Sequence, residues 1–311
     1  MNIYHGIEKF DKLRHAVVTS GTFDGVHIGH QKILSRLKEL CSKQAGESVL
    51  LTFWPHPRMV LYPSENPFKL LNSIEEKAAI LEKTGLDHLL IVPFTAEFAN
   101  ISSDDFVREI LVEKIGTKKL IIGYNHRFGK NRAGSFEALQ NNAPNFGFEV
   151  EEIPRQDIDN MGVSSTRIRL ALAEGDIRTA YELLGRPYEL NGTVVDGNKL
   201  GRTIGFPTAN IQIDFAHKLI PADGTYAVSI EIEKAVFKGM MNIGYRPTVA
   251  GASRNIEVHI FDFDHDIYHK KIKVKLHDKI REEQKFDSVE LLKKQLIQDR
   301  IIAQEILRKL N

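Results

Sequence analysis

Hydrophobic and polar positions divide the chain into two parts with different periodicities. In the first part, short apolar runs such as "HAVVTS" at 15–20 and "SVLLTFW" at 48–54 alternate with amphipathic segments. One of these, "HQKILSRLKELCSKQ", places Ile33, Leu37 and Leu40 on one side of a helix. Short apolar strands that alternate with such helices predict βαβ units and a parallel sheet.

The same alternation continues through the first half of the chain. The helix "SIEEKAAILEKTG" has a predicted N-cap at Ser73, Glu76 three residues later and Gly85 after its end. Further strands and helices are predicted in "HLLIVPF", "SSDDFVREILVEKIG", "KKLIIGYN", "FGFEVEEI", "SSTRIRLALAEG" and "DIRTAYELLG". We place the end of this Rossmann-like part at Leu184, which gives a first domain of residues 1–184.

From about residue 187 the pattern changes to short β runs separated by glycine and proline. In "KKIKVKLHD", lysines alternate with Ile272, Val274 and Leu276, as in a half-buried strand. Short strands with this punctuation predict a small antiparallel β-barrel at 185–311. The barrel is followed by a long C-terminal helix, for which Asp287 is the predicted N-cap.

Composition narrows the classes of protein that this chain can represent. The 42 Lys and Arg residues balance 41 Asp and Glu residues, so no overall charge attracts nucleic acid or a membrane. The one cysteine, Cys41, excludes an internal disulfide and is expected to fill the core. The start of the chain lacks a signal-peptide pattern, and no apolar run approaches the roughly 20 residues of a membrane span. We therefore expect a cytoplasmic protein that binds anions through local groups.

The stretch "TSGTFDGVHIGHQKIL" at 19–34 joins the first predicted strand to the first predicted helix. A helix N-terminus at such a junction presents unpaired N–H groups and the positive end of its dipole, which bind phosphate. Gly21 and Gly29 allow a close backbone approach, although the spacing matches neither a dinucleotide-binding fingerprint nor a P-loop. The stretch predicts an anion site but does not define the reaction.

Two histidines in this stretch, His27 and His30, add chemistry to the predicted anion site. Imidazole N–H groups can stabilise charge that develops on a phosphate. The histidines could instead only cap the helix, and a zinc site would need a third ligand, for which His56 is the nearby candidate. On the residues alone, phosphate binding, capping and metal binding stay open.

The segment "GRTIGFPTANI" at 201–211 is the densest motif of the second half. Thr208 and Asn210 are two residues apart, so an extended strand places both side chains on one face. A hydroxyl and an amide carbonyl are hard oxygen ligands, which suit Mg²⁺ that bridges ATP phosphates.

Three segments of the first half resemble prokaryotic FAD synthetases of the adenylyltransferase superfamily. They are "GTFDGVHIGH", "GYNHRFGKNRAG" at 123–134 and "VSSTRIR" at 163–169. The resemblance implies that this half is a nucleotidyltransferase domain in which His27 and His30 are catalytic and lie over the triphosphate of ATP. It implies further phosphate contacts by Gly21, Phe23, Gly29, Asn125, Arg127, Ser164, Ser165, Thr166 and Arg167.

The resemblance also implies a flavin-side pocket formed by "TFWPHPRMVL" at 52–61 and "FTAEFANIS" at 94–102. Its predicted residues are Pro55, His56, Pro57 and Phe98. Trp54 departs from the acidic residue of many relatives, and both a buried position and stacking on the flavin stay open for it.

The "PTAN" sequence in a small barrel resembles riboflavin kinase. The resemblance implies that Thr208 and Asn210 bind Mg²⁺ and that Gly201, Gly205 and Pro207 contact ATP. The segment "NIEVHIFDF" at 255–263 resembles the kinase segment whose glutamate is the general base, which is Glu257 here. One departure is His269, which stands where relatives usually have glycine.

The two resemblances together cover essentially the whole chain, in the order of the bifunctional bacterial enzyme. They imply that ATP and riboflavin give FMN, and that ATP and FMN then give FAD and pyrophosphate. The implied cofactor is Mg²⁺, and the implied partners are riboflavin, FMN and ATP, with no nucleic acid or membrane and with a weak homo-oligomer left open.

Three alternatives remain at this point. The chain could have only one active half, or could be a flavin- or nucleotide-binding regulator. It could also be an aminoacyl-tRNA synthetase with a related HxGH segment, but it lacks a KMSKS-like segment and a basic footprint for tRNA.

Overall fold

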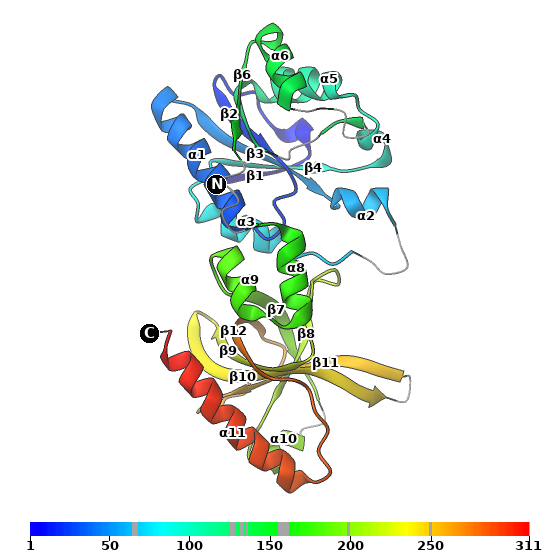
Figure 1. The fold of residues 1–311 in the computed structure, drawn as a ribbon, viewed down its shortest axis with the longest axis vertical. Helices are drawn as coiled ribbons and strands as arrows, with labels where there is room; N and C mark the ends of the chain where they lie inside the picture. The colour runs from blue at the N-terminus through cyan, green and yellow to red at the C-terminus, as the bar shows by residue number, and fades with distance from the viewer. Residues whose placement is uncertain are drawn as a thin grey trace. The chain divides into compact units, whose positions relative to one another are not determined.

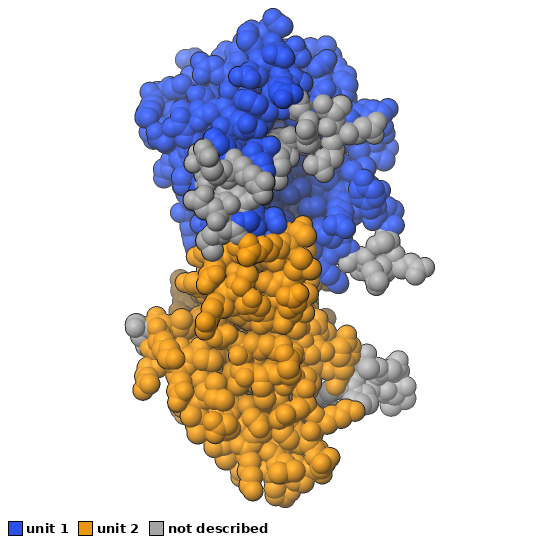
Figure 2. Space-filling view, in the orientation of Figure 1, with its two compact units in different colours: residues 1–165 blue, residues 166–311 orange. Residues whose placement is uncertain are grey.

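The computed structural model describes residues 1–63, 68–124, 128–130, 134, 136–154, 162–197, 200–248 and 251–310. The chain forms two compact units, residues 1–165 and 166–311 (Figure 2). The first contains a parallel sheet and the second a closed antiparallel barrel (Figure 1). The predicted architecture is therefore confirmed. Among the described residues, none of the helices combines the length and apolar character that a membrane crossing requires.

The sheet of the first unit has six parallel strands in the order β1-β4-β3-β2-β5-β6. They are β1 (Asn2–His5), β2 (Ala16–Ser20), β3 (Glu47–Trp54), β4 (His88–Pro93), β5 (Thr117–Gly123) and β6 (Glu149–Ile153). Every residue of the central β2 is buried, as continuous apolar runs in parallel sheets require. The sequence did not predict β1, because this edge strand has only four residues and three of them are exposed.

Helices connect the strands of this unit, and η1, α1, η2 and α6 contact the sheet itself (Figure 1). They are η1 (Ile7–Lys9), α1 (Ile28–Gln44), α2 (Pro57–Leu61), α3 (Ile74–Glu82), α4 (Ala96–Ala99), α5 (Ser103–Asp105), η2 (Phe106–Ile115) and α6 (Phe136–Phe146). Ser73 and Glu76 form the predicted capping box of α3. The helix predicted at "SSDDFVREILVEKIG" is present, but η2 within it is wound as a π-helix.

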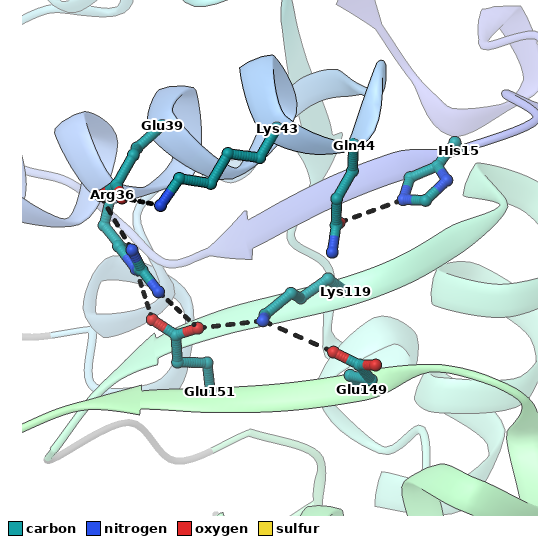
Figure 3. A network of polar contacts seen from close by, with 8 residues as sticks. All are labelled: His15, Arg36, Glu39, Lys43, Gln44, Lys119, Glu149 and Glu151. Carbon is teal, nitrogen blue, oxygen red and sulfur yellow. Dashed lines mark hydrogen bonds and ion pairs between the residues drawn. The ribbon is translucent and has the colours of Figure 1, made fainter.

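An ionic network ties α1 to the far strands of the sheet (Figure 3). Arg36 Nε lies 2.6 Å from Glu151 Oε1 on β6, and Lys119 Nζ on β5 lies 3.0 Å from Glu151 Oε2. The Arg36 guanidinium keeps the pKa of Glu151 below its usual value. On α1 itself, Arg36 also pairs with Glu39 at 2.8 Å. This network helps to fix the helix that begins at the predicted anion site.

The barrel of the second unit closes in the order β10-β11-β8-β7-β12-β9, with all neighbours antiparallel. Its strands are β7 (Tyr188–Val195), β8 (Ala209–Ile213), β9 (Gly224–Ile232), β10 (Ala235–Thr248), β11 (Gly251–Ile260) and β12 (Lys271–Arg281). Ile272, Val274 and Leu276 are buried, as their alternation predicted. Closure leaves no long sheet edge exposed.

In the described part of the second half, the helices that accompany the barrel are α8 (Ser165–Glu174), α9 (Ile177–Leu184), α10 (Leu200–Thr203) and α11 (Val289–Arg308). The long α11 contacts β9, β10 and β12 along the outside of the barrel (Figure 1). There Ala303 and Leu307 pack with Phe206 and Phe261. The predicted N-cap, Asp287, is wrong by one residue: Ser288 caps α11, accepting a hydrogen bond from the Leu291 N–H at 3.2 Å.

Along the chain, the division into two compact units falls between Ser165 and Thr166, whereas the change in sequence pattern led us to a boundary at Leu184. The helix α9 contacts β7 and β12, and the Ala222 N–H donates to the Leu172 carbonyl of α8 at 2.9 Å. Both helices therefore pack with the barrel. The domain boundary at residue 184 stays a prediction.

Candidate active sites

The loop between β2 and α1 carries the first group of predicted site residues. Its Gly21 N–H donates to the Leu51 carbonyl at 3.0 Å, and the Val26 N–H donates to the Phe23 carbonyl at 3.2 Å. Phe23 and Val26 have positive φ angles of 45° and 39°. Such a φ is an outlier for a β-branched residue and persists only where the surroundings impose it. The loop is thus held in a strained shape.

Asp24 fixes this loop from within. Its side chain is 2% exposed, and its carboxylate accepts hydrogen bonds from the N–H groups of Leu71 and Asn72 at 3.1 to 3.3 Å. Its carbonyl accepts a hydrogen bond from Ser165 Oγ at 2.8 Å. Asp24 therefore links the loop to two segments that are distant in sequence.

The side chain of Lys77, on α3, makes hydrogen bonds that support the same loop. It is 5% exposed, and its Nζ donates to the Thr22 carbonyl at 2.6 Å and to Thr52 Oγ1 at 3.4 Å. Burial lowers the pKa of Lys77 to about 8, while the charge of Asp24 opposes this shift. The sequence did not reveal Lys77, because it lies in an ordinary amphipathic helical pattern.

The two histidines lie together at the N-terminus of α1. His27 is the N-cap, and its Nδ1 accepts a hydrogen bond from the His30 N–H at 3.3 Å. The two rings stack with centroids 3.6 Å apart, and the Phe23 ring stacks on His30 at 4.4 Å. Because Nδ1 of His27 accepts, its neutral ring carries the proton on Nε2, which can donate to an anionic oxygen. Helix capping by His27 is therefore real and compatible with phosphate binding.

The predicted flavin-side residues lie beyond the carboxyl ends of β3 and β4. Pro55 follows Trp54 through a cis peptide bond, and Pro57 begins α2. His56 is the N-cap of α2, accepting a hydrogen bond from the Arg58 N–H at 3.1 Å. The short α2 itself was not predicted.

Phe98 belongs to an aromatic cluster at the same edge of the sheet. Its ring lies 5.7 Å from the rings of both Phe53 and Phe94, and Phe106 connects it to Phe128. Ligands of open α/β sheets bind at this edge of the strands. The cluster thus offers an apolar surface where the sequence placed the flavin.

The remaining residues assigned to phosphate contacts are distributed over several places. Gly29 lies buried in the first turn of α1, and Ser164 and Ser165 lie at the start of α8. Thr166 and Arg167 belong to the second compact unit. Asn125 and Arg127 lie outside the described residues. The roles of these residues in phosphate binding stay predictions.

A second cluster of polar side chains lies on the barrel. Glu257 of β11 stands directly opposite Asn210 of β8 and opposite Asn242 of β10. Thr208 Oγ1 donates to Glu257 Oε2 at 3.1 Å, and Asn255 Nδ2 donates to Glu257 Oε1 at 2.6 Å. The structure therefore brings together Thr208, Asn210 and Glu257, which lie in two distant sequence motifs.

The segment before β8 folds back on itself. The Phe206 N–H donates to the Gly201 carbonyl at 2.8 Å, and a Cβ on Gly201 would collide with the Phe206 carbonyl oxygen. Gly205 has a φ of +85°, which also favours glycine. Both glycines therefore have a conformational reason to be there.

His259 anchors the residue that follows this turn. Its Nδ1 donates to the Pro207 carbonyl at 2.8 Å. Burial lowers the pKa of His259, so the ring is neutral at physiological pH. This hydrogen bond fixes the backbone just before Thr208.

The comparisons with known proteins agree with both halves of this geometry. A family model described as FAD synthetase matches residues 9–167, and a model described as riboflavin kinase matches residues 184–307. Bifunctional riboflavin kinase/FMN adenylyltransferases are similar along nearly their whole length. The protein from Pseudomonas fluorescens is 41% identical and covers 90% of this chain and 89% of its own. The one from Haemophilus influenzae is 38% identical, with coverage of 96% and 97%.

Among solved structures, one described as a macrolide-efflux protein from Streptococcus pneumoniae superposes with a TM-score of 0.90 at 32% identity. It covers 98% of this chain and 99% of its own. The two family models follow each other along the chain as the parallel-sheet unit and the barrel do. The chain belongs to the bifunctional riboflavin kinase/FMN adenylyltransferase family, and with ATP it converts riboflavin to FMN and FMN to FAD.

Proposed function

We propose that adenylyl transfer takes place at the loop after β2 and the N-terminus of α1. An FMN phosphate oxygen attacks the α-phosphorus of ATP, the bond from that phosphorus to the bridging oxygen of the β-phosphate breaks, and pyrophosphate leaves. His27 and His30 stabilise the charge that develops, and Gly21, Phe23 and Gly29 shape the backbone around the phosphates. The stacked histidine pair at a helix N-terminus is the observation that supports this assignment.

No protein nucleophile is needed in this step, because the FMN phosphate itself attacks. The enzyme contributes orientation and charge stabilisation. We assign Ser164, Ser165, Thr166 and Arg167 to the leaving pyrophosphate, Asn125 and Arg127 to the phosphates, and Pro55, His56, Pro57 and Phe98 to the flavin. The aromatic cluster around Phe98 supports the last of these assignments.

We propose that Glu257 is the base of riboflavin phosphorylation. It accepts the proton of the ribityl 5′-hydroxyl as that oxygen attacks the γ-phosphorus of ATP, and ADP leaves with the electrons of the broken P–O bond. Gly201, Gly205 and Pro207 hold the segment that contacts the nucleotide. The hydrogen bond between Thr208 and Glu257, opposite Asn210, is the observation that supports this site.

The donor atoms of this cluster fit Mg²⁺. The Thr208 hydroxyl and the Asn210 amide oxygen are hard oxygen ligands, and both lie beside the Glu257 carboxylate. When bound, the ion neutralises charge on the β- and γ-phosphates of ATP. Thr208 and Asn210 are the residues that would hold it.

We also propose that the protein acts in the cytoplasm. A weak homo-oligomer stays a prediction, which sedimentation at several protein concentrations would test.

Two substitutions test the separate assignments. His30→Ala should slow conversion of FMN to FAD by about 10² to 10³-fold and leave phosphorylation of riboflavin unchanged. Glu257→Gln should slow FMN formation by about 10² to 10⁴-fold and leave adenylylation of added FMN unchanged. Each reaction is followed by separating riboflavin, FMN and FAD after incubation with ATP and Mg²⁺.

Matched controls are His15→Ala, just before β2, and the exposed Glu233→Gln in the barrel, which should retain both activities. Unimpaired FMN formation by Glu257→Gln would remove Glu257 as the base. Loss of both activities in His30→Ala would refute the separate assignment of the two sites.

A further inference from the structure

The barrel cluster contains a fourth residue that neither sequence motif singled out. Asn255 lies on β11, two residues before Glu257, so both side chains lie on the same face of the strand. Ile256 and Val258 alternate with them and are buried in the core. Asn255 is therefore placed beside the proposed catalytic group by the pleat of the strand.

The side-chain amide of Asn255 connects Glu257 with Asn210. Its Nδ2 lies 2.6 Å from Glu257 Oε1 and 3.2 Å from Asn210 Oδ1. An amide nitrogen carries two hydrogens, so it can donate to both oxygens at once. Thr208 occupies the other carboxylate oxygen of Glu257, at 3.1 Å from Oε2.

Hydrogen-bond chemistry fixes the orientation of both amides. An ionised carboxylate only accepts, so the nitrogen of Asn255 must face Glu257. The same nitrogen then requires an acceptor from Asn210, which has to be its oxygen. A flip of either amide would lose at least one of these bonds.

We propose that Asn255 is a positioning residue for riboflavin phosphorylation. It holds the Glu257 carboxylate in one orientation, and it determines which end of the Asn210 side chain is the oxygen. This inference rests on the proposed roles of Glu257 and Asn210. A positioned base and a correctly oriented metal ligand both matter in the transition state, so the effect belongs mainly in kcat.

The test uses Asn255→Asp, which keeps the shape of the side chain and removes its donors. In this variant a second carboxylate faces Glu257 and the Asn210 oxygen. We expect kcat for FMN formation to fall at least about 100-fold, with the KM for riboflavin within about twofold of wild type. Asn255→Ala removes the donors without adding repulsion, so its kcat should fall less, by about 10-fold.

The Mg²⁺ dependence gives a second measurement. Because the Asn210 amide loses its fixed orientation, the Mg²⁺ concentration for half-maximal FMN formation should rise in both variants. Adenylylation of added FMN by the same samples reports that the chain is folded. Gln212→Ala, an exposed change on β8 two residues after Asn210, is the matched control and should behave as wild type.

Wild-type kcat and Mg²⁺ dependence in Asn255→Asp would overturn the inference. The inference would also be overturned if Asn255→Ala lowered kcat only because the variant unfolds at the assay temperature. In that case, the melting temperature would be lower and kcat would return to the wild-type value in a colder assay. The Glu257→Gln variant, assayed in parallel, distinguishes a failure of the positioning role of Asn255 from a failure of the base role of Glu257. If Glu257→Gln is inactive while Asn255→Asp is active, the base survives and the positioning role fails; unimpaired Glu257→Gln contradicts the base itself.

Discussion

At the scale of single residues, the buried side chain of Lys77 supports the loop between β2 and α1, where we propose that adenylyl transfer takes place. Its Nζ donates to the Thr22 carbonyl at the start of a strained loop. Within the loop, the Asp24 carboxylate accepts hydrogen bonds from the backbone N–H groups of Leu71 and Asn72. Burying an ammonium costs free energy unless it is well solvated by protein groups. The lowered pKa of Lys77 is the sign of that cost.

Lys77→Met should remove a pH-dependent part of the stability of the first unit. The pKa of Lys77 is about 8 in the folded chain and 10.5 without the fold. The unfolded chain therefore binds more protons between these values, and the wild type gains up to about 3 kcal/mol as the pH rises through this window. The variant lacks that rise. Urea unfolding followed through Trp54, the only tryptophan, measures this at several pH values.

Lys83→Met, an exposed change at the C-cap of the same helix, should keep the wild-type pH dependence. If the free energy of unfolding depended on pH identically in Lys77→Met and in the wild type, the buried ammonium of Lys77 would not be the cause of the rise in stability.

The motifs led to the residues that we propose for the two sites, but not to the residues that hold them in place. His27 and Glu257, which we propose to act on the substrates, stand in segments that resemble known families. Asp24 and Asn255 lie in the same segments, but the motifs did not reveal what their side chains bind, and Lys77 lies in no motif. Apart from Glu257, which is two residues from Asn255 in the strand, the partners of these three residues lie 25 or more positions away in sequence, and only the fold brings them together.

At the scale of elements, periodicity predicted most strands and helices, and the misses have local causes. The barrel strands were found because a closed sheet with one buried face forces alternation. The edge strand β1 and the short α2 were missed because four or five residues carry too little pattern. The start of α11 was placed one residue early, because Asp287 and Ser288 are both good N-caps and only the geometry distinguishes them.

The attachment of α11 to the barrel depends on a buried ion pair. Asp299 is fully buried and accepts hydrogen bonds from Nε and Nη2 of Arg281 at 2.8 to 3.0 Å. Gln295 Nε2 donates to the same carboxylate at 2.8 Å. Removing one partner leaves the other charge without compensation, which is costly in a protein interior.

Asp299→Ala should therefore destabilise the barrel by about 3 to 5 kcal/mol. Thermal unfolding followed by circular dichroism measures the loss, and riboflavin phosphorylation should fail at a lower temperature than FMN adenylylation.

The double variant Arg281→Met with Asp299→Leu should regain much of the stability, because neither charge remains buried. The exposed Gln298→Ala on the same helix should change stability by less than about 0.5 kcal/mol. A melting temperature equal to wild type in Asp299→Ala would contradict the importance of this pair.

At the scale of the whole molecule, the central residues of the two proposed sites lie in different compact units, which have separate cores. The histidine pair lies in the first unit, and the Glu257 cluster lies in the second. The sequence predicted this division because the two halves differ in periodicity. FMN is the product of one site and the substrate of the other, and we expect it to leave the barrel and bind again as a free molecule.

A mixture of His30→Ala and Glu257→Gln proteins should therefore make FAD from riboflavin, although neither variant does so alone. The Glu257→Gln molecules take up FMN that the His30→Ala molecules have released, so FAD appears only after a lag in which free FMN accumulates. Time courses that separate the three flavins measure the lag, and added FMN should abolish it. A different protein that binds free FMN tightly, added in excess as a trap, should also suppress the conversion of riboflavin to FAD by the wild type. If the mixture makes FMN but no FAD, while Glu257→Gln still adenylylates added FMN, then transfer depends on both sites within one molecule and free diffusion is excluded as the route.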